Sequence, residues 1–457
     1  MLGGEQNMYD LIIIGSGPAG YVAAIRAGQV GLKTVIIEKN EIGGMCLNWG
    51  CIPSKSMMES VKLYQKITKD SARFGIEGID KKALSFNWSK GIKRADTIVK
   101  RLTGGVEFLL KKNGVEIIKG EAKIISSTSV LADNRLLEAK NIIIATGSSS
   151  VKIDNSIENL VVETKKLFTE REIPENIVVI GKSPVAIELA QLFSMMDRKV
   201  TLISDSSVIM PKADSYVRNY MESKIKKEKI EIIYNTKIKS TKEIWKDGIL
   251  NLSGKEIACD LIINASDRKA NIIKSDIDIE IKDGFIAVDE NCETSVKGIY
   301  AVGDVNGLAM FAHIGSAQGL FVINRLKGIE GKLDISKLPM NMYTVPEAAQ
   351  IGFTEDKLKE NGYDYKVSEF PLSANGKAQT EGSADGFVRI LSDNKLGEVL
   401  GVQIVAPNAT DMINEAAAYI QLESTVYDIA QTVHTHPTVS EVFMEAGFEA
   451  VDKAIHK

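Results

Sequence analysis

Cysteine is scarce in this chain of 457 residues, which has only four, and the sequence has no long hydrophobic run. Four cysteines in so long a chain exclude a secreted disulfide scaffold. The missing hydrophobic run excludes a transmembrane span, and no stretch has the pattern of a signal peptide. We therefore predict a cytoplasmic protein without a membrane partner.

An excess of one charge sign is also absent. The chain has 56 lysines and arginines against 60 aspartates and glutamates, which gives a net charge of -4. Nucleic-acid binding usually needs a basic face, so this balance gives no reason to expect it. With 44% hydrophobic residues the chain can bury several cores. Its length predicts two to four domains.

Two of the four cysteines, Cys46 and Cys51, lie five positions apart in the segment GGMCLNWGCIPSK. A bridge across so short a stretch of chain is strained, and strain favours its reduction. Lys55 follows Cys51 by four residues, so on a helix its cation would lie on the same face and lower the pKa of the thiol. This pattern predicts a redox-active disulfide, and two buried structural cysteines are the alternative. Cys259 and Cys292 have no partner at useful spacing, and we expect them to be inert.

Residues 9–14 are an apolar run of strand length, followed by the turn GSGPAG and an alanine-rich helical pattern. Gly15 permits a tight turn, Gly17 lets the backbone approach a pyrophosphate, and Gly20 lets helix and strand pack closely. The next apolar strand ends in Glu38, about 20 residues on, where a carboxylate can bind the hydroxyls of an adenosine ribose. The sequence therefore predicts a dinucleotide site at this turn.

The segment GGMCLNWGCIPSK closely resembles the redox-active segment of the flavin disulfide reductases, and its CIPSK ending is similar to the dihydrolipoamide dehydrogenase branch. The resemblance implies an α/β fold with two Rossmann-like dinucleotide-binding domains and a C-terminal α+β dimerisation domain. It implies FAD as the cofactor and a Cys46–Cys51 disulfide. The implied domains are 8–148 (FAD-binding, with the disulfide), 149–270 (NAD-binding-like), 271–337 (central, completing the FAD site) and 338–457 (interface). Residues 1–7 lack periodicity and precede a second methionine, so we leave them out of the fold, and whether they are native stays open.

The second half of the implied FAD site is the segment GIYAVGDV, a strand that ends in Gly303 and Asp304. The carboxylate of Asp304 can bind the ribitol hydroxyls of FAD, and an ordinary aspartate at a strand end is the alternative. A helix expected from Ala312 would stabilise negative charge on the flavin with its N-terminal amides. Three further positions match family segments that pass the dinucleotide: Ala122, Thr146 and Gly147.

The implied second nucleotide domain departs from the family pattern. After an apolar strand its turn reads GKSPVA, in which only the first glycine, Gly181, is kept. In the family, glycines leave this turn without side chains, so that the backbone can approach the pyrophosphate. Here Lys182 and Ser183 place side chains in the turn, and Ala186 adds a methyl group where helix and strand pack closely. We expect this domain to fold as an α/β unit but to bind NAD poorly.

Two other segments of the implied NAD site have changed as well. Ser204 stands where an acidic residue would bind the NAD ribose, and Asp267 replaces a glycine in a third segment. Glu188 is kept, where the family glutamate pairs with the lysine of the cysteine helix, here Lys55. A buried lysine without a counter-ion tends to lose its charge, which favours this pair, and a surface glutamate is the alternative.

The C-terminal segment HTHPTVSE contains His436 and Glu441. A carboxylate that hydrogen-bonds an imidazole fixes its tautomer and raises its basicity. Without the family match, a helix cap or a surface histidine is the alternative. The resemblance assigns His436 as the base, Glu441 as its partner and the disulfide of a second subunit as their target, so it implies a homodimer. Residues 59–112 are predicted to be a charged, amphipathic helical covering without chemistry, and no metal site is predicted.

The implied reaction is thiol–disulfide exchange. A dithiol such as dihydrolipoamide would attack Cys46 while His436 takes its proton, and Cys51 would then pass electrons to FAD. The predicted substrate is a lipoyl-bearing protein or another small dithiol or disulfide, and a ferredoxin or flavodoxin is the predicted electron partner if NAD does not bind. Two alternatives stay open: an ordinary NAD-dependent dihydrolipoamide dehydrogenase, and a non-catalytic flavoprotein subunit.

Overall fold

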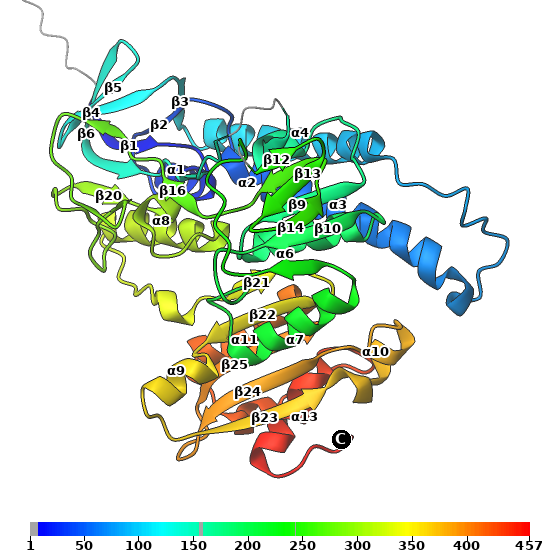
Figure 1. Ribbon diagram of the computed structural model, residues 1–457. Helices are drawn as coiled ribbons and strands as arrows, with labels where there is room; N and C mark the ends of the chain where they lie inside the picture. Colours follow the sequence, from blue (N-terminus) through cyan, green and yellow to red (C-terminus); the bar gives the residue numbers. More distant parts are fainter. Residues whose placement is uncertain (1–7, 155–158, 243) are drawn as a thin grey trace, which may run out of the picture. The chain divides into compact units, whose positions relative to one another are not determined.

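The structure is a computed structural model that describes residues 8–154, 159–242 and 244–457. These residues form two compact units, each made of two separate stretches of chain (Figure 1). Unit 1 contains the described residues up to 174 together with 266–335, and unit 2 contains 175–265 and 336–457. The units therefore join most of the predicted segments 8–148 and 271–337 in one body, and most of 149–270 and 338–457 in the other.

Unit 1 is built around a largely parallel sheet. Its strand order is β17-β4-β5-β6-β1-β2-β3, and β20 also pairs with β6. The central strand β1 lies parallel to β2 and β6, so the carboxyl ends of all three meet at one edge. The strands are β1 (Tyr9–Ile14), β2 (Thr34–Glu38), β3 (Glu116–Lys119), β4 (Ala122–Ser126), β5 (Ser129–Ala132), β6 (Arg135–Ile144), β7 (Ser148–Ser150), β8 (Val161–Glu163), β16 (Arg268–Ala270), β17 (Lys274–Ser275), β18 (Ile281–Lys282), β19 (Phe285–Ile286) and β20 (Ile299–Ala301).

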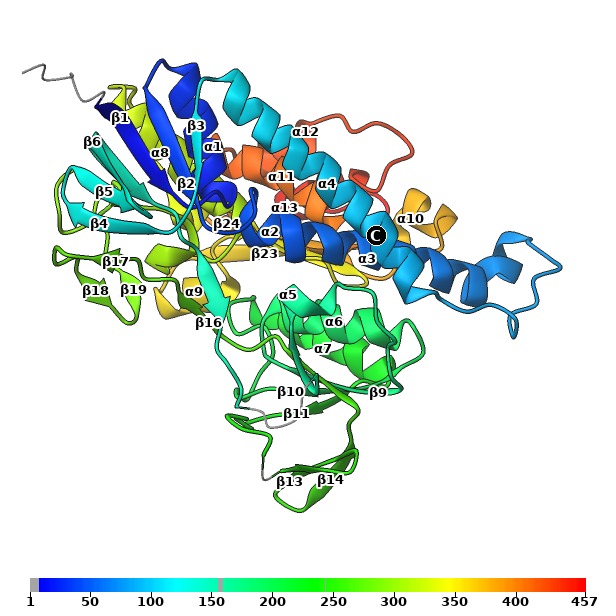
Figure 2. The same cartoon turned by 90° about the horizontal axis from the view of Figure 1, so that it is seen from above.

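The helices of unit 1 cover this sheet. α1 packs on α8, and α4 packs on α1, α2 and α3, as the view from above shows (Figure 2). The helices are α1 (Pro18–Gln29), α2 (Gly44–Trp49), α3 (Cys51–Gln65), α4 (Trp88–Lys112), α5 (Thr164–Leu167) and α8 (Ala312–Leu326). Short π- or 3-10 turns of this unit are η1 (Lys66–Asp70), η2 (Ser71–Phe74) and η3 (Gly303–Asn306), and η4 (Ile335–Lys337) begins at the last residue of the unit.

The helical pattern predicted over residues 59–112 is wrong in its middle. Gly75 has a φ of +75° and stands directly after η2, and Gly78 has a φ of +78°. These left-handed conformations suit glycine and end a helix. The chain then returns to helix only at α4, whose first turn is capped by the side chain of Asn87.

Unit 2 has two parts. In the first, the strands β11, β10, β9 and β15 pair in parallel in that order, and β12, β13 and β14 form a small antiparallel sheet. Its elements are β9 (Asn176–Ile180), α6 (Pro184–Ser194), β10 (Lys199–Ile203), α7 (Ser215–Lys227), β11 (Glu231–Ile233), β12 (Trp245–Lys246), β13 (Ile249–Leu252), β14 (Lys255–Ala258) and β15 (Leu261–Asn264).

The second part of unit 2 is an antiparallel sheet of order β21-β22-β25-β24-β23 that packs against α11 and α13 around one buried cluster. The predicted α/β fold with a C-terminal α+β part is confirmed. The elements are β21 (Met340–Met342), β22 (Glu347–Gly352), α9 (Glu355–Glu360), β23 (Tyr365–Pro371), η5 (Leu372–Ala374), α10 (Gly376–Thr380), β24 (Phe387–Asp393), β25 (Val399–Ala406), α11 (Ala409–Gln421), α12 (Val426–Gln431) and α13 (Glu441–Val451).

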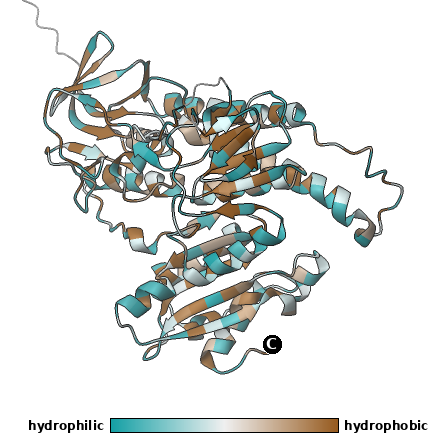
Figure 3. Ribbon diagram, viewed as in Figure 1, coloured by the Kyte–Doolittle hydropathy of each residue, from teal (hydrophilic) through white to brown (hydrophobic). Residues whose placement is uncertain are grey.

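Hydropathy follows this architecture. The sheet strands are mostly brown in Figure 3, because their apolar runs fill the cores, whereas teal residues gather on helices and connecting loops. In the part of the chain that the structure describes, no helix combines the length and the apolar character that a membrane crossing needs. The same residues contain no cluster of three or more histidine, cysteine or acidic side chains placed to hold a metal ion.

Candidate active site

The turn between β1 and α1 needs its glycines. Gly15 has a φ of +101°, and a side chain there would overlap the carbonyl oxygen of Ala145. A side chain on Gly20 would overlap the carbonyl oxygen of Gly15, so only glycine lets helix and strand pack this closely. Gly17, the N-cap of α1, instead has open space in front of it. The backbone can therefore approach a phosphate at the helix N-terminus.

Glu38 ends β2 beside this turn and is buried, with 9% exposure. Its Oε2 accepts hydrogen bonds from the backbone N and the Oγ of Ser16, each at 2.8 Å. Its Oε1 accepts one from the backbone N of Asn40 at 2.7 Å. These bonds fix the carboxylate next to the glycine turn, and carboxylate oxygens have lone pairs left for a ribose hydroxyl.

The disulfide joins α2 to α3. Cys46 lies on α2, Cys51 begins α3, and their sulfur atoms are bonded with 4.6 Å between the Cα atoms. Gly44 has a φ of +58°, and a side chain there would come within 2.7 Å of the Cα of Gly17, so α2 begins directly against the glycine turn. The predicted Cys46–Cys51 bridge is confirmed.

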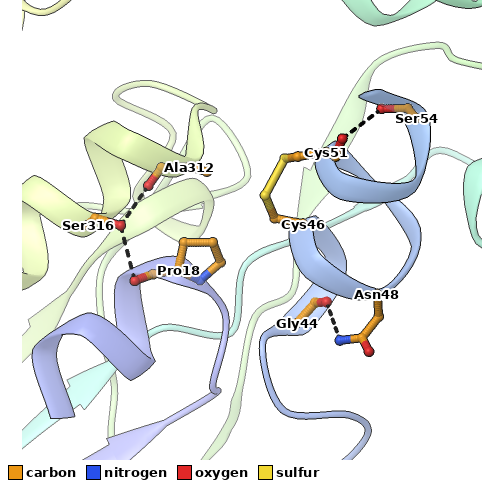
Figure 4. Close-up of a disulfide and its surroundings, with 8 residues drawn as sticks. All are labelled: Pro18, Gly44, Cys46, Asn48, Cys51, Ser54, Ala312 and Ser316. Atoms are coloured by element: carbon orange, nitrogen blue, oxygen red, sulfur yellow. Dashed lines mark hydrogen bonds between the residues drawn. A yellow bond between two sulfur atoms is a disulfide. The ribbon is translucent and has the colours of Figure 1, made fainter. Parts of the chain in front are cut away.

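Figure 4 shows the surroundings of this bridge. The sulfur atoms face the side where Pro18 of α1 and Ala312 of α8 lie. Ser316 ties these two elements together, since its Oγ donates to the carbonyl oxygens of Pro18 at 3.2 Å and Ala312 at 3.1 Å. The start of α8 thus lies near the start of α1, as expected for two halves of one site.

Asp304 anchors the second half of the site. Its Oδ2 accepts a hydrogen bond from the Oγ of Ser148 at 2.5 Å, and that Oγ accepts one from the Nε of Arg268 at 2.8 Å. Burial lowers the pKa of Arg268, an effect that the carboxylates of Asp304 and Glu163 oppose. Sequence reasoning missed Ser148 and Arg268. Ser148 and Arg268 meet because β16 pairs with β7, and no local sequence pattern predicts this pairing.

Eleven predicted residues line one cavity of about 450 Å³, entirely within unit 1. This volume lies in the range of cofactor sites, about 300–1,000 Å³. The cavity combines a glycine turn at a helix N-terminus, two carboxylates and a disulfide, and this set of groups fits the parts of FAD and its redox partner. Gly20 supports the turn from behind, and Lys55 is outside the lining. The lining residues are Gly15, Gly17, Glu38, Cys46, Cys51, Ala122, Thr146, Gly147, Gly303, Asp304 and Ala312.

The corresponding turn of unit 2 holds an ion pair. Gly181, between β9 and α6, has a φ of +150°, and a side chain there would overlap the carbonyl oxygen of Ala265. The Nζ of Lys182 lies 3.0 Å from Oδ1 of Asp205, which follows β10. Ser183 is the N-cap of α6, and Ala186 is fully buried against the turn. The charged pair therefore bridges the carboxyl ends of two neighbouring parallel strands, where this fold binds dinucleotides.

Ser204 and Asp267 are placed differently. Ser204 is fully buried, and its Oγ accepts a hydrogen bond from the backbone N of Ser206 at 3.1 Å, so it closes a local turn. Asp267 belongs to unit 1, where its carbonyl oxygen accepts a hydrogen bond from the backbone N of Val151 at 3.0 Å. The structure does not bring Asp267 together with Gly181 and Ser204 inside one unit, and its role stays a prediction.

His436 and Glu441 lie together in unit 2. The Nδ1 of His436 is 2.8 Å from Oε1 of Glu441, and Oε2 accepts a hydrogen bond from the backbone N of Thr438 at 2.7 Å. Burial acts to raise the pKa of Glu441, but the bonds from Thr438 and His436 outweigh it and hold the pKa below its usual range. The imidazole is 79% exposed, so its Nε2 is open to a reactant. Its role as a base stays a prediction.

Sequence reasoning gave no role to His434. Its Nε2 lies 2.7 Å from Oε1 of Glu415, and this contact raises the pKa of His434 although burial opposes it. Both residues line a cavity of about 630 Å³ near α11. Glu188 is buried on α6, where its Oε1 accepts a hydrogen bond from the backbone N of Tyr343 at 2.9 Å. Lys55 lies in the other unit, so the predicted pair of Glu188 and Lys55 stays a prediction.

Comparisons with known proteins extend over almost the whole chain. Residues 9–319 match the family model "Pyridine nucleotide-disulphide oxidoreductase", and residues 338–447 match its dimerisation domain. Dihydrolipoyl dehydrogenase of Bacillus subtilis is 35% identical over 98% of this chain and 99% of its own length. The mitochondrial dihydrolipoyl dehydrogenase of Pisum sativum is 35% identical over 99% of this chain and 93% of its own length. The crystal structure of LpdA from Mycobacterium tuberculosis has the same fold, with a TM-score of 0.86, 23% identity and coverage of 96% and 98%.

Proposed function

The chain belongs to the pyridine nucleotide-disulphide oxidoreductase family, and from this premise we propose that it oxidises or reduces a small dithiol/disulfide of the lipoyl type while NAD binds poorly. It is an enzyme of the dihydrolipoyl dehydrogenase-like kind, with a redox-active Cys46–Cys51 bridge. One observation carries the proposal: the bridge lines the same cavity as the phosphate-binding turn at Gly15 and the carboxylates of Glu38 and Asp304.

The cofactor that the family implies is FAD. Gly15, Gly17 and Glu38 would hold its adenosine and pyrophosphate, and Asp304, fixed by Ser148, would hold its ribitol. When bound, FAD supplies a two-electron carrier next to the bridge.

The chemistry of the chain itself is thiol–disulfide exchange. One sulfur of a dithiol attacks Sγ of Cys46 as a thiolate, the S–S bond breaks, and Sγ of Cys51 leaves as a thiolate. The second substrate sulfur then attacks the mixed disulfide, which releases the oxidised substrate and leaves Cys46 and Cys51 reduced. The substrate loses two electrons and two protons. The bridge gains the two electrons, a base takes the first proton, and Sγ of Cys46 takes the second as it leaves the mixed disulfide.

His436 would take the first of these protons. Its Nδ1 is held by Glu441, so Nε2 is the free basic atom, and the negative carboxylate stabilises the imidazolium that forms. The dimerisation domain supports a homodimer. We propose that His436 of one protomer acts on the bridge of the second, which makes the dimer the active species.

Poor NAD binding is supported by the ion pair between Lys182 and Asp205. A dinucleotide that occupied this turn would have to open the pair and desolvate Asp205. A hydrogen bond between charged groups contributes about 1.5–3 kcal/mol, which corresponds to about a tenfold to hundredfold loss of affinity. Ser204 adds to this loss because it offers no carboxylate to the ribose. The electron partner in place of NAD would then be a protein of the ferredoxin or flavodoxin kind.

A labelling experiment tests the proposed exchange. Anaerobic dihydrolipoamide should open the bridge, so that maleimide then labels Cys46 and Cys51, as mass spectrometry of peptides would show. The other two cysteines are an internal control, because Cys259 and Cys292 are buried and burial raises the pKa of each thiol to about 12. A bridge that stays closed under excess dithiol would refute the proposed activity and favour a non-catalytic flavoprotein.

A further inference from the structure

The loop that carries His436 is exposed except at one residue. It connects α12, which ends at Gln431, to α13, which begins at Glu441. Residues 432, 433 and 435–437 are exposed, and the side chain of His436 keeps 79% of its exposure. The side chain of His434 keeps only 6%, so it packs against the body of unit 2. A loop with so few buried side chains is loosely held, and its position depends on the one that is buried.

Both ring nitrogens of His434 face hydrogen-bond acceptors. Nδ1 lies 2.9 Å from the carbonyl oxygen of Thr432, and Nε2 lies 2.7 Å from Oε1 of Glu415 on α11. A carbonyl oxygen and a carboxylate can only accept, so each ring nitrogen must carry a hydrogen and the ring is an imidazolium. The hydrogen bond to Glu415 raises the pKa of His434, with further support from Thr432 and Glu441, although burial opposes them. A protonated ring cannot take up another proton, so His434 is not a second base.

The ion pair of His434 and Glu415 spans a groove between α11 and the loop. The groove has a volume of about 630 Å³. Because this space is not filled by side chains, packing alone does not hold the loop against α11 here. The ion pair therefore ties one wall of the groove to the other. These walls include Glu415, Ala418 and Tyr419 of α11 and Thr432, His434 and Thr435 of the loop.

A second anchor holds the loop on the other side of His436. The backbone N of Thr438 donates to Oε2 of Glu441 at 2.7 Å, and its carbonyl oxygen accepts a hydrogen bond from Nδ2 of Asn375 at 3.1 Å. His436 thus lies two residues after one anchor, His434, and two residues before the other, Thr438. The rate that a general base contributes depends on its distance and orientation, so both anchors bear on the reaction.

We propose that His434 and Glu415 form a positioning pair, which holds His436 in the orientation in which it accepts the proton of the attacking thiol. The inference rests on the proposed function, since it gives a second His–Glu pair a role in the same reaction. His434 acts through His436. The proton passes from the thiol to Nε2 of His436 as the substrate sulfur attacks Cys46, and His434 keeps its own proton throughout.

The charge of the His434 ring can be measured by NMR. The chain has four histidines, so protein labelled with carbon-13 at histidine Cε1 gives four signals, which single substitutions assign. The signal of His434 should titrate above about pH 6.5, the ordinary value, and should move down toward it in Glu415→Gln. A wild-type signal that titrates at the ordinary value would overturn the inference. The other titratable groups on the surrounding elements stay unchanged in this variant: Tyr419 of α11, Asp428 of α12, Glu441 of α13 and His436 of the loop.

Single-turnover opening of the bridge by dihydrolipoamide separates positioning from binding. His434→Gln should lower the maximum rate by about 10–10²-fold and leave the half-saturating concentration unchanged, because a misplaced base slows proton transfer without weakening binding. Glu415→Gln keeps the size of the side chain and should act in the same direction, which guards against a folding defect. The matched control is His456→Gln, which breaks a His–Glu contact of the same length, 2.7 Å, with Glu445 in the same unit and should leave both values unchanged.

A double variant tests whether His434 acts through His436. His434→Gln combined with His436→Gln should open the bridge no more slowly than His436→Gln alone, because the positioning pair then has no base to position. Losses that multiply in the double variant, or an unchanged maximum rate in His434→Gln, would overturn the inference. Dissociation of the dimer in His434→Gln, seen by gel filtration, would also overturn it by making the loss an effect of assembly.

Hydrogen exchange of the loop separates this inference from the proposed function. Peptides that cover residues 432–438 should exchange faster in His434→Gln than in the wild type, and at the wild-type rate in His456→Gln. If no dithiol opens the bridge but loop exchange rises as expected, the proposed function fails and the anchoring of the loop by His434 stands. Unchanged loop exchange in His434→Gln would overturn the inference even if the dithiol opens the bridge.

Discussion

Replacing Lys182 by alanine should strengthen the binding of NADH to this protein. Lys182 and Asp205 lie 3.0 Å apart and keep 25% and 29% of their side-chain exposure. A charged hydrogen bond contributes about 1.5–3 kcal/mol, and partial exposure favours the lower end, so removing the pair should tighten binding by about tenfold. The variant also frees Asp205 to accept hydrogen bonds from a ribose. A calorimetric titration of the oxidised protein with NADH measures the dissociation constant.

A matched control makes this measurement specific. Lys199 forms a similar ion pair with Glu175, at 2.7 Å, at the amino end of the same strand, β10. Lys199→Ala should therefore leave the dissociation constant of NADH unchanged. If Lys182→Ala instead weakens NADH binding, Lys182 contacts the phosphates of the nucleotide, and the argument that the ion pair obstructs the turn is refuted.

Three further predictions concern the rest of the site. Gly20→Val should yield protein that loses FAD on gel filtration, because the side chain would overlap the carbonyl oxygen of Gly15, and retention of stoichiometric FAD would contradict this packing. His436→Gln should slow bridge opening by dihydrolipoamide about 10²–10⁴-fold in stopped-flow labelling, and an unchanged rate would remove the imidazole from the reaction. Glu415 raises the pKa of His434 in the folded protein, so the protonated imidazole stabilises the folded state. This stabilisation is complete below about pH 6.5, the pKa of an unfolded histidine, and it is lost as the pH rises through the higher pKa of the folded protein. The urea midpoint should fall over that range in the wild type but stay flatter in Glu415→Gln, and parallel profiles would refute the assignment.

The sequence predictions that the structure confirms rest on residues a short distance apart in the chain. Gly15, Gly17 and Gly20 are close in sequence. Packing requires Gly15 and Gly20, because a side chain at either position would overlap a carbonyl oxygen, and Gly17 has open space in front of it at the start of α1. Glu38 follows at the distance that one helix and one strand require, and Cys46 and Cys51 are neighbours on consecutive helices. Such motifs can be recognised in a sequence because one local conformation determines both the fold and the positions of the chemical groups.

Contacts between distant segments could not be predicted. Ser148 meets Asp304 across 156 positions and Arg268 across 120, and nothing near either residue marks the partner. The departures from the NAD pattern were visible in the sequence. The ion pair between Lys182 and Asp205 could not be predicted from these departures, because it forms only when the sheet brings the ends of β9 and β10 together. Side-chain pairing across a fold follows from tertiary packing, which local patterns do not encode.

An anaerobic stopped-flow comparison tests most directly whether electrons enter through the disulfide rather than through a nicotinamide. The FAD-loaded wild-type protein is mixed separately with dihydrolipoamide, NADH and NADPH, and bleaching of the flavin absorbance is recorded. Rapid, saturable reduction by the dithiol and slow reduction by both nicotinamides is the expected result. Fast, saturable reduction by low concentrations of NADH would contradict it and identify an ordinary NAD-dependent dihydrolipoamide dehydrogenase.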